Sequence, residues 1–140
     1  MTTETKKRFQ GGSFLVETPA PDQIFTPEDF TDEAKILGQT TREFVEKEIA
    51  PRADELEQKS EDFACMRELV LKGGEIGLFA ADIPEAYGGL DVPKTASMYM
   101  VENLAESGSF NVTHGAHSGI GTLPIVYFGT EEQKKEWLPK

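Results

Sequence analysis

Residues 107–130 read S-G-S-F-N-V-T-H-G-A-H-S-G-I-G-T-L-P-I-V-Y-F-G-T and contain no Asp, Glu, Lys or Arg, in a chain that is 28% charged. Solvated helices carry charge on their outer face, so this neutral stretch is not typical of one. A membrane span needs about 20 mostly apolar residues, whereas five Gly, two His and Pro124 interrupt this run. We therefore expect a segment that protein covers on nearly every side, with small residues at points of close approach.

The neutral stretch demands more cover than its own neighbours readily supply. Its eight large apolar side chains would each gain roughly 1.5–3 kcal/mol from full burial; they are Phe110, Val112, Ile120, Leu123, Ile125, Val126, Tyr127 and Phe128. Leaving half of them exposed forfeits on the order of 6–12 kcal/mol, comparable with the ~5–15 kcal/mol net stability of a domain. We therefore predict that the chain is one domain of a larger protein and that the stretch faces an inter-domain cleft.

Composition bounds the remaining possibilities. The 140 residues suffice for one domain with a core. A net charge of −11 and a pI near 4.6 argue against nucleic acid and anionic membrane surfaces as partners. One cysteine, Cys65, permits no internal disulfide and indicates a reducing compartment. With no targeting pattern in residues 1–25 and no transmembrane segment, we predict a cytoplasmic protein.

Helix-start signals divide the chain outside the neutral stretch. Residues 1–25 include Pro19 and Pro21 and are predicted to form an extended arm, followed by a helical domain over residues 26–140. A capped proline predicts a single turn at 27–30, before a main helix that starts at Asp32.

Further helices are predicted from apolar periodicity and from breakers. Pro51 should kink or end the first helix, with a further turn or two over residues 52–58. A second helix is expected over 63–77, with Met66, Leu69, Val70 and Ile76 inward and a left-handed stop at Gly77. A third, mostly buried helix is expected over 93–106.

The neutral stretch is predicted to form a fourth helix over 109–120, interrupted afterwards by Pro124. The sequence T-E-E-Q at 130–133 is a complete capping box and predicts the last helix. No run alternates with the period of a strand. The predicted class is all-α, an up-and-down bundle of about five to six helices.

Residues that could carry chemistry are few. His114 and His117 are three apart and could in principle share a metal, but no carboxylate is near them in sequence, so satisfied polar groups at a cleft are the favoured interpretation. Glu102 and Glu106 could form an acid–base pair, although a solvated helix face explains them equally simply. Cys65, beside Met66, is interpreted as a core residue. No catalytic residue and no metal ligand are predicted.

Several motifs resemble a known family. They are I-P-E-A-Y-G-G-L at 83–90, E-N-L-A at 102–105, F-G-T-E-E-Q-K-K-E-W-L-P-K at 128–140 and F-T-D-E at 30–33. In order and spacing they are similar to the N-terminal helical domain of the acyl-CoA dehydrogenases over roughly residues 25–140. The segment G-A-H-S-G-I-G at 115–121 resembles the long- and very-long-chain branch and its bacterial fatty-acid degradation relatives.

The resemblance implies an FAD-dependent flavoenzyme of fatty-acid β-oxidation. Such enzymes convert a fatty acyl-CoA to a trans-2-enoyl-CoA and pass electrons to an electron-transfer flavoprotein. In the family, a middle β domain holds most of the flavin, and a C-terminal helical domain carries the catalytic glutamate and the homo-oligomer contacts. Because this chain contains neither motif, we expect the remaining domains of the same enzyme as partners, and neither FAD binding nor activity from this chain alone.

The resemblance also implies which residues face the substrate. In the family the corresponding helix lines the tunnel for the acyl tail, and the tail-facing positions carry over onto Val112, Thr113, Ala116 and Ile120. Shorter-chain relatives place larger polar side chains at the Val112 and Ala116 positions. The small or apolar residues here, with Gly115 and Gly119 adjacent, imply a deeper tunnel and a preference for long acyl chains.

Alternatives remain open at this stage. The small residues could merely allow tight helix packing. The chain could belong to a related acyl-CoA oxidase or short-chain dehydrogenase, which the choice between electron-transfer flavoprotein and oxygen as acceptor would separate. It could also be a non-enzymatic helical interaction module that re-uses the domain.

Overall fold

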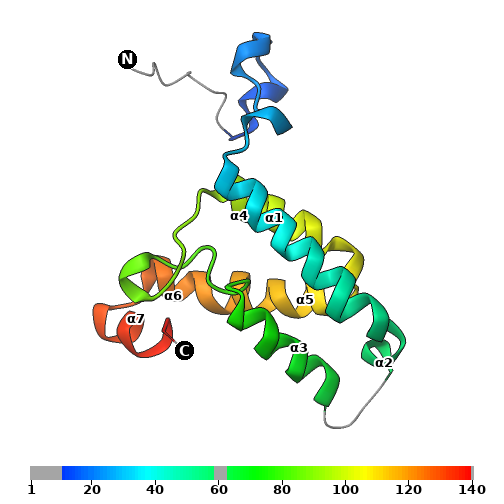
Figure 1. The fold of residues 1–140 in the computed structure, drawn as a ribbon. Helices are drawn as coiled ribbons and strands as arrows, with labels where there is room; N and C mark the ends of the chain where they lie inside the picture. Colours follow the sequence, from blue (N-terminus) through cyan, green and yellow to red (C-terminus); the bar gives the residue numbers. More distant parts are fainter. Residues whose placement is uncertain (1–10, 59–62, 140) are drawn as a thin grey trace. The chain divides into compact units, whose positions relative to one another are not determined.

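The computed structural model describes residues 11–58 and 63–139 and divides the chain into two compact units, residues 1–31 and 32–140 (Figure 1). All regular structure in the described residues is helical, and none of them lies in a strand. This confirms the predicted all-α class. The first ten residues of the predicted arm lie outside the described residues.

The first unit consists of short helical turns. These span Gly11–Leu15, Pro21–Gln23 and Pro27–Asp29. The backbone N–H of Thr26 donates to Asp29 Oδ2 at 2.9 Å, which fixes the start of the third turn. Phe25 packs edge-on against Phe30, with ring centroids 5.0 Å apart. The predicted single turn just before the main helix is confirmed.

The second unit contains five helices. They are α1 (Asp32–Phe44), continued by π-helical turns (Val45–Ile49), a 3₁₀ turn (Ala50–Arg52) and α2 (Ala53–Glu57); α3 (Ala64–Glu75); α4 (Lys94–Leu104); α5 (Ser109–Gly115), continued by π-helical turns (Ala116–Thr122) and α6 (Leu123–Phe128); and α7 (Glu131–Trp137). In Figure 1, α1 and α4 lie side by side, and α5 continues into α6 along one line past α3. The predicted capping box is confirmed at α7, where Gln133 N–H donates to Thr130 Oγ1 at 3.3 Å.

Both long helices accommodate a proline. Pro51 lies in the 3₁₀ turn after the π-helical turns Val45–Ile49, and Pro124 lies in the first turn of α6 after the π-helical turns Ala116–Thr122. Proline lacks an N–H and its ring crowds the preceding turn, and a wider or tighter turn relieves both problems. The expected continuation beyond Pro51 is confirmed. The prediction that Pro124 interrupts the fourth helix was wrong, because helical structure runs from 109 to 128.

The core lies where α1, α3, α4 and α5 meet. Phe110 is fully buried and its ring lies 5.7 Å from that of Phe44 and 6.3 Å from that of Phe79, between centroids. Around it pack Val45, Ile49, Leu56, Cys65, Leu69, Leu78, Ala81, Met100 and Leu104. At about 1.5–3 kcal/mol for each large apolar side chain, this cluster is the main source of stability in the second unit.

Two burial predictions were wrong. Within α4, Met98 is 63% exposed and Val101 is 39% exposed, so the helix buries one face, towards α1 and α5, and not most of its surface. Ile76 is also exposed, because α3 ends at Glu75 and the chain turns away there. The predicted left-handed stop is confirmed at Gly77, whose φ is +82°.

A compact loop over residues 78–92 joins α3 to α4. Its two ends pair through the backbone, as Leu90 N–H donates to the Ala80 carbonyl at 2.9 Å and Val92 N–H to the Ala81 carbonyl at 3.0 Å. The backbone of Gly89 lies directly against Ile83, where a Cβ atom would overlap the Ile83 carbonyl. The loop therefore requires glycine at 89 for close backbone approach.

His114 ties this loop to α5. It is only 2% exposed, and its Nε2–H donates to the Leu78 carbonyl at 2.8 Å. The other ring nitrogen, Nδ1, is buried with no hydrogen-bond partner among the described residues. Burial lowers the pKa of His114 below its ordinary value of 6.5, because a second, unpartnered N–H would carry charge into the interior.

Substituting Gly89 with Ala should destabilise the protein by about 1–3 kcal/mol, since the added methyl group overlaps backbone that cannot rotate away. Urea-unfolding curves measure the change. Gly74→Ala is the matched control, because a Cβ atom there meets nothing within 4 Å and alanine favours helix by roughly 0.5–1 kcal/mol. Equal stabilities for the two variants would contradict the close packing at Gly89.

His114 should make stability fall with acidity. The unfolded histidine takes up a proton near pH 6.5 and the folded one only at lower pH, so the stability present above about pH 6.5 is lost as the pH falls through that value. The loss is at most about 1.4 kcal/mol per pH unit for one proton. Unfolding free energies measured across this range should change less steeply in His114→Gln than in the parent. The exposed-residue control His117→Gln should retain the parent slope, and a parent slope in His114→Gln would refute the assignment.

Candidate functional site

The helix formed by α5, the π-helical turns and α6 carries every predicted site residue, and its start is held by α2. Ser109 N–H donates to Glu57 Oε1 at 3.0 Å, and Ser109 Oγ donates to Glu57 Oε2 at 2.7 Å. These hydrogen bonds lower the pKa of Glu57. A carboxylate at a helix N-terminus is favourable, because it accepts otherwise unpaired N–H groups and faces the positive end of the helix dipole. Glu57 therefore fixes where this helix begins.

This helix has two very different faces. Phe110 and His114, four residues apart, are 0% and 2% exposed and point into the core. Val112 and Ile120 are 73% and 82% exposed, and Ala116 between them is exposed as well. A spacing of four places these three residues on one face of a helix. We call Val112, Ala116 and Ile120 the apolar stripe.

The other predicted site residues flank the apolar stripe. Thr113 is half-buried and its Oγ1 donates to the Ser109 carbonyl at 3.0 Å. Gly115 is exposed and Gly119 is half-buried, and a Cβ atom at either would meet nothing within 4 Å. No part of the described chain approaches these glycines closely. The alternative that the small residues serve tight helix packing therefore finds no support within the described residues.

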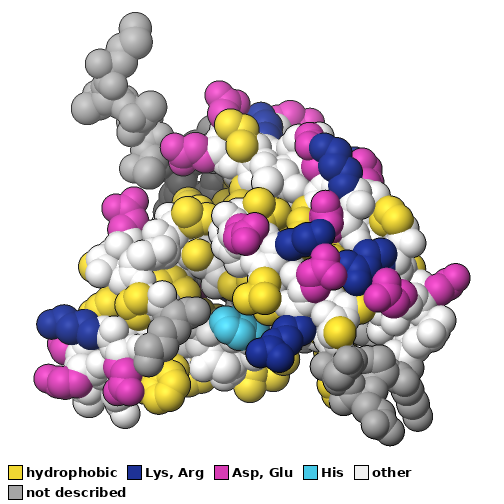
Figure 2. All heavy atoms as spheres, turned by 60° about the horizontal axis from the view of Figure 1, so that its bottom comes forward, with side chains coloured by type: hydrophobic (Ala, Val, Ile, Leu, Met, Phe, Trp, Pro, Cys, Tyr) yellow, Lys and Arg dark blue, Asp and Glu magenta, His cyan; other side chains and the backbone are white. Residues whose placement is uncertain are grey.

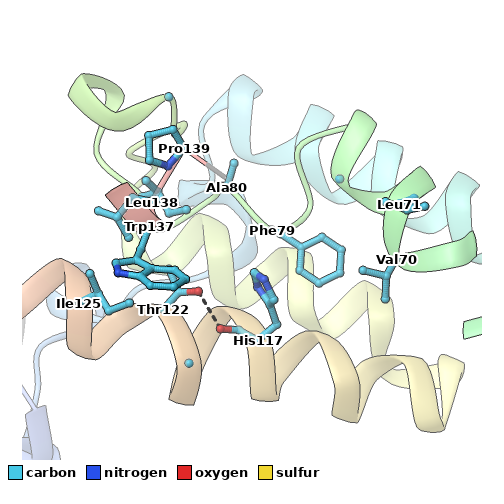
Figure 3. Close-up of a pocket in the computed structure, with 14 residues that line it drawn as sticks. Val70, Leu71, Phe79, Ala80, His117, Thr122, Ile125, Trp137, Leu138 and Pro139 are labelled. Carbon is cyan, nitrogen blue, oxygen red and sulfur yellow. Dashed lines mark hydrogen bonds between the residues drawn. The ribbon is translucent and has the colours of Figure 1, made fainter. Parts of the chain in front are cut away.

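A first cavity of about 650 Å³ lies between α3, the loop after it, α6 and α7 (Figure 3). His117 lies within it, with its ring edge-on to Phe79 at 5.1 Å between centroids. Thr122 Oγ1 donates to the His117 carbonyl at 2.8 Å. The other lining residues are mostly apolar: Val70, Leu71, Gly74, Ala80, Ile83, Gly88, Gly121, Ile125, Trp137, Leu138 and Pro139. Figure 2 shows hydrophobic side chains gathered around a histidine on the face it displays.

A second cavity of about 610 Å³ lies beside the start of α5, between α5, α2 and α3. Val112 and Thr113 line it from the site helix. The remaining lining residues come from α2, α3 and their flanks: Glu55, Leu56, Glu57, Gln58, Phe63, Cys65, Met66, Gly108 and Ser109. Sequence reasoning missed the α2 and α3 side of this cavity, because only the fold brings residues 55–66 next to residue 112.

No set of side chains in the described residues has the makings of a catalytic or metal centre. No group of three or more His, Cys, Asp or Glu in this part of the chain could hold a metal ion. Glu102 and Glu106 are exposed, in agreement with a solvated face. Cys65 is buried, and burial raises the pKa of its thiol, which confirms it as a core residue. None of the described helices is long and apolar enough to cross a bilayer.

FAD does not fit the described cavities. Its diphosphate requires cationic side chains or a cluster of backbone N–H donors. Neither cavity is lined by Lys or Arg, and the second carries the carboxylates of Glu55 and Glu57. The described residues therefore offer binding surface for apolar groups and not for a flavin nucleotide.

Comparisons with known proteins agree with one another. Residues 31–140 match the family described as "Acyl-CoA dehydrogenase, N-terminal domain". A probable acyl-CoA dehydrogenase of Bacillus subtilis is 48% identical over 130 residues, covering 93% of this chain and 22% of that protein. Mitochondrial isovaleryl-CoA dehydrogenase of Bos taurus is 34% identical over 110 residues, covering 78% of this chain and 26% of that protein. The chain thus spans about a quarter or less of these relatives.

Two solved structures share the fold. One is the acyl-CoA dehydrogenase of Bacillus anthracis complexed with FAD, with a TM-score of 0.86 and 48% identity over 94% of this chain and 22% of that one. The other is a chain of the electron transferring flavoprotein of Acidaminococcus fermentans, with a TM-score of 0.70 and 29% identity over 81% of this chain and 30% of that one. Since the family match covers most of the sequence and the five-helix fold agrees with it, this chain belongs to the acyl-CoA dehydrogenase N-terminal domain family.

Proposed function

We propose that this chain is the N-terminal domain of an FAD-dependent acyl-CoA dehydrogenase that converts long-chain fatty acyl-CoA to trans-2-enoyl-CoA in fatty-acid β-oxidation. Its part is to line the tunnel for the acyl tail with the apolar stripe and with Thr113, Gly115 and Gly119. The observation that carries this proposal is the exposure of Val112 and Ile120, 73% and 82%, on a helix without a charged residue.

The apolar stripe suits a methylene chain for two physical reasons. Each CH₂ group that leaves water gains about 0.8 kcal/mol, and the exposed valine and isoleucine gain as well when a chain covers them. No ionised group lies along the stripe to oppose that transfer. Ala116 and the neighbouring glycines add no bulk that would stop the tail, which supports a long-chain substrate and membership of the long- and very-long-chain branch, with its bacterial fatty-acid degradation relatives.

Other domains of the same enzyme complete the proposal. The catalytic base and the flavin site would come from them, because the described cavities contain neither, and this chain alone would be inactive. FAD would accept the hydride when bound there. The electron acceptor would be an electron-transfer flavoprotein, which the likeness to a chain of such a protein supports. The single cysteine supports a cytoplasmic setting, and the subunit would form homo-oligomers through domains outside this chain.

Ala116→Glu should shorten the tunnel. A carboxylate in the middle of the apolar stripe would have to lose water beside the acyl tail, so kcat/KM for palmitoyl-CoA should fall about ten-fold or more, with a smaller effect on butyryl-CoA. The measurement is a chain-length profile of the protein expressed with the remaining domains of its gene. Ala105→Glu, at an exposed alanine after α4 that lines neither cavity, is the control. Unchanged long-chain turnover in Ala116→Glu would contradict the assignment.

A further inference from the structure

We propose that the second cavity, beside the start of α5, is an end chamber that receives the methyl terminus of the acyl chain. The proposal rests on the proposed function and extends it. It adds residues of α2 and α3, chiefly Leu56, Cys65 and Met66, to the determinants of chain length.

The apolar stripe leads directly into this chamber. Ile120, Ala116 and Val112 lie along about 12 Å of one helix face, at roughly 1.5 Å per residue. Val112, the last of them, and its neighbour Thr113 line the cavity themselves. A chain that follows the stripe towards the start of α5 therefore arrives at the mouth of the cavity. The first cavity offers no such continuity, because no residue of the apolar stripe lines it.

The inner wall of the chamber is apolar. Leu56 and Cys65 are 9% and 8% exposed, Met66 is half-buried, and all three present hydrocarbon or sulfur to the space. Methionine is flexible and adapts to an apolar ligand. A volume of about 610 Å³ is within the roughly 300–1,000 Å³ of small-molecule sites.

Charge at the rim selects the kind of chain end. Glu55 and Glu57 line the chamber, and no Lys or Arg is among the described residues that do so. Both carboxylates turn to protein partners, Glu57 to Ser109 and Glu55 to Arg52, whose Nε lies 3.0 Å from Glu55 Oε2. They do not offer a partner to an anionic group, and they repel one. The chamber therefore accepts an unsubstituted methyl end and rejects a terminal carboxylate.

Filling the chamber tests its role. In the protein expressed with its remaining domains, Met66→Trp should lower the ratio of kcat/KM for palmitoyl-CoA to that for butyryl-CoA by about ten-fold or more, because the indole occupies the space of the chain end. Met98→Trp, the same change at a 63%-exposed methionine on α4, is the control and should leave the ratio at the parent value. The ω-carboxyl analogue of palmitoyl-CoA should be at least about ten-fold poorer than palmitoyl-CoA in the parent.

Cys65 gives a readout that needs no variant and no turnover. Because it lines the chamber, its modification by methyl methanethiosulfonate, followed on the Cys65 peptide by mass spectrometry, should slow at saturating palmitoyl-CoA. Butyryl-CoA, too short to reach the chamber, should leave the rate unchanged. An alkaline buffer is needed, since burial raises the pKa of this thiol.

The outcomes separate the two proposals. A protein that oxidises both acyl-CoAs, but whose length ratio survives Met66→Trp or whose Cys65 reacts equally fast with either ligand, would overturn the end chamber and leave the proposed function standing. A protein with flavin that oxidises no acyl-CoA would overturn the proposed function, and the chamber with it. If Met66→Trp does not fold, the protection of Cys65 by palmitoyl-CoA alone decides whether the chamber holds the chain end.

Discussion

The burial of Phe110 is the constraint on which the rest of the second unit depends. This side chain has no exposed surface, and its ring packs with Phe44 of α1 and Phe79 of the loop after α3. Three segments far apart in the sequence therefore meet on one residue of α5. Once Phe110 is inside, helical geometry turns the residues two and six positions later, Val112 and Ala116, away from the core.

Two polar contacts fix the same helix against sliding and rotation. Glu57 caps its first turn through both oxygens, and His114 bonds to the Leu78 carbonyl one turn further along. Directional hydrogen bonds specify a register that apolar packing alone tolerates only loosely. The unpartnered Nδ1 of His114 costs some stability, and the cost falls on a residue that keeps the loop over 78–92 attached to the helix. Orientation of the apolar stripe is thus set from its opposite face.

Local signals made much of this fold predictable, and long-range ones did not. The capping box at Thr130 and the charge gap over 107–130 depend on neighbours in sequence, so the sequence revealed the last helix and an unusual surface. The helix through Pro124 was not predictable, because it depends on the π-helical turns Ala116–Thr122 that absorb the proline. The exposed face of α4 and the second cavity depend on which distant residues meet. No periodicity reports that Met66 lies across a cavity from Val112.

The split between a buried and an exposed face has a consequence for how such a domain can change its specificity. Substitutions at Phe110 or His114 alter the core and are felt in stability. Substitutions at Val112, Ala116 or Ile120 alter a surface that makes few contacts within this chain, so they can reshape what lies against it at little cost to folding. A helix built this way keeps its position while its outer face varies. Tail length in such a domain is then set by a handful of exposed positions and by the space beyond them, and not by repacking the fold.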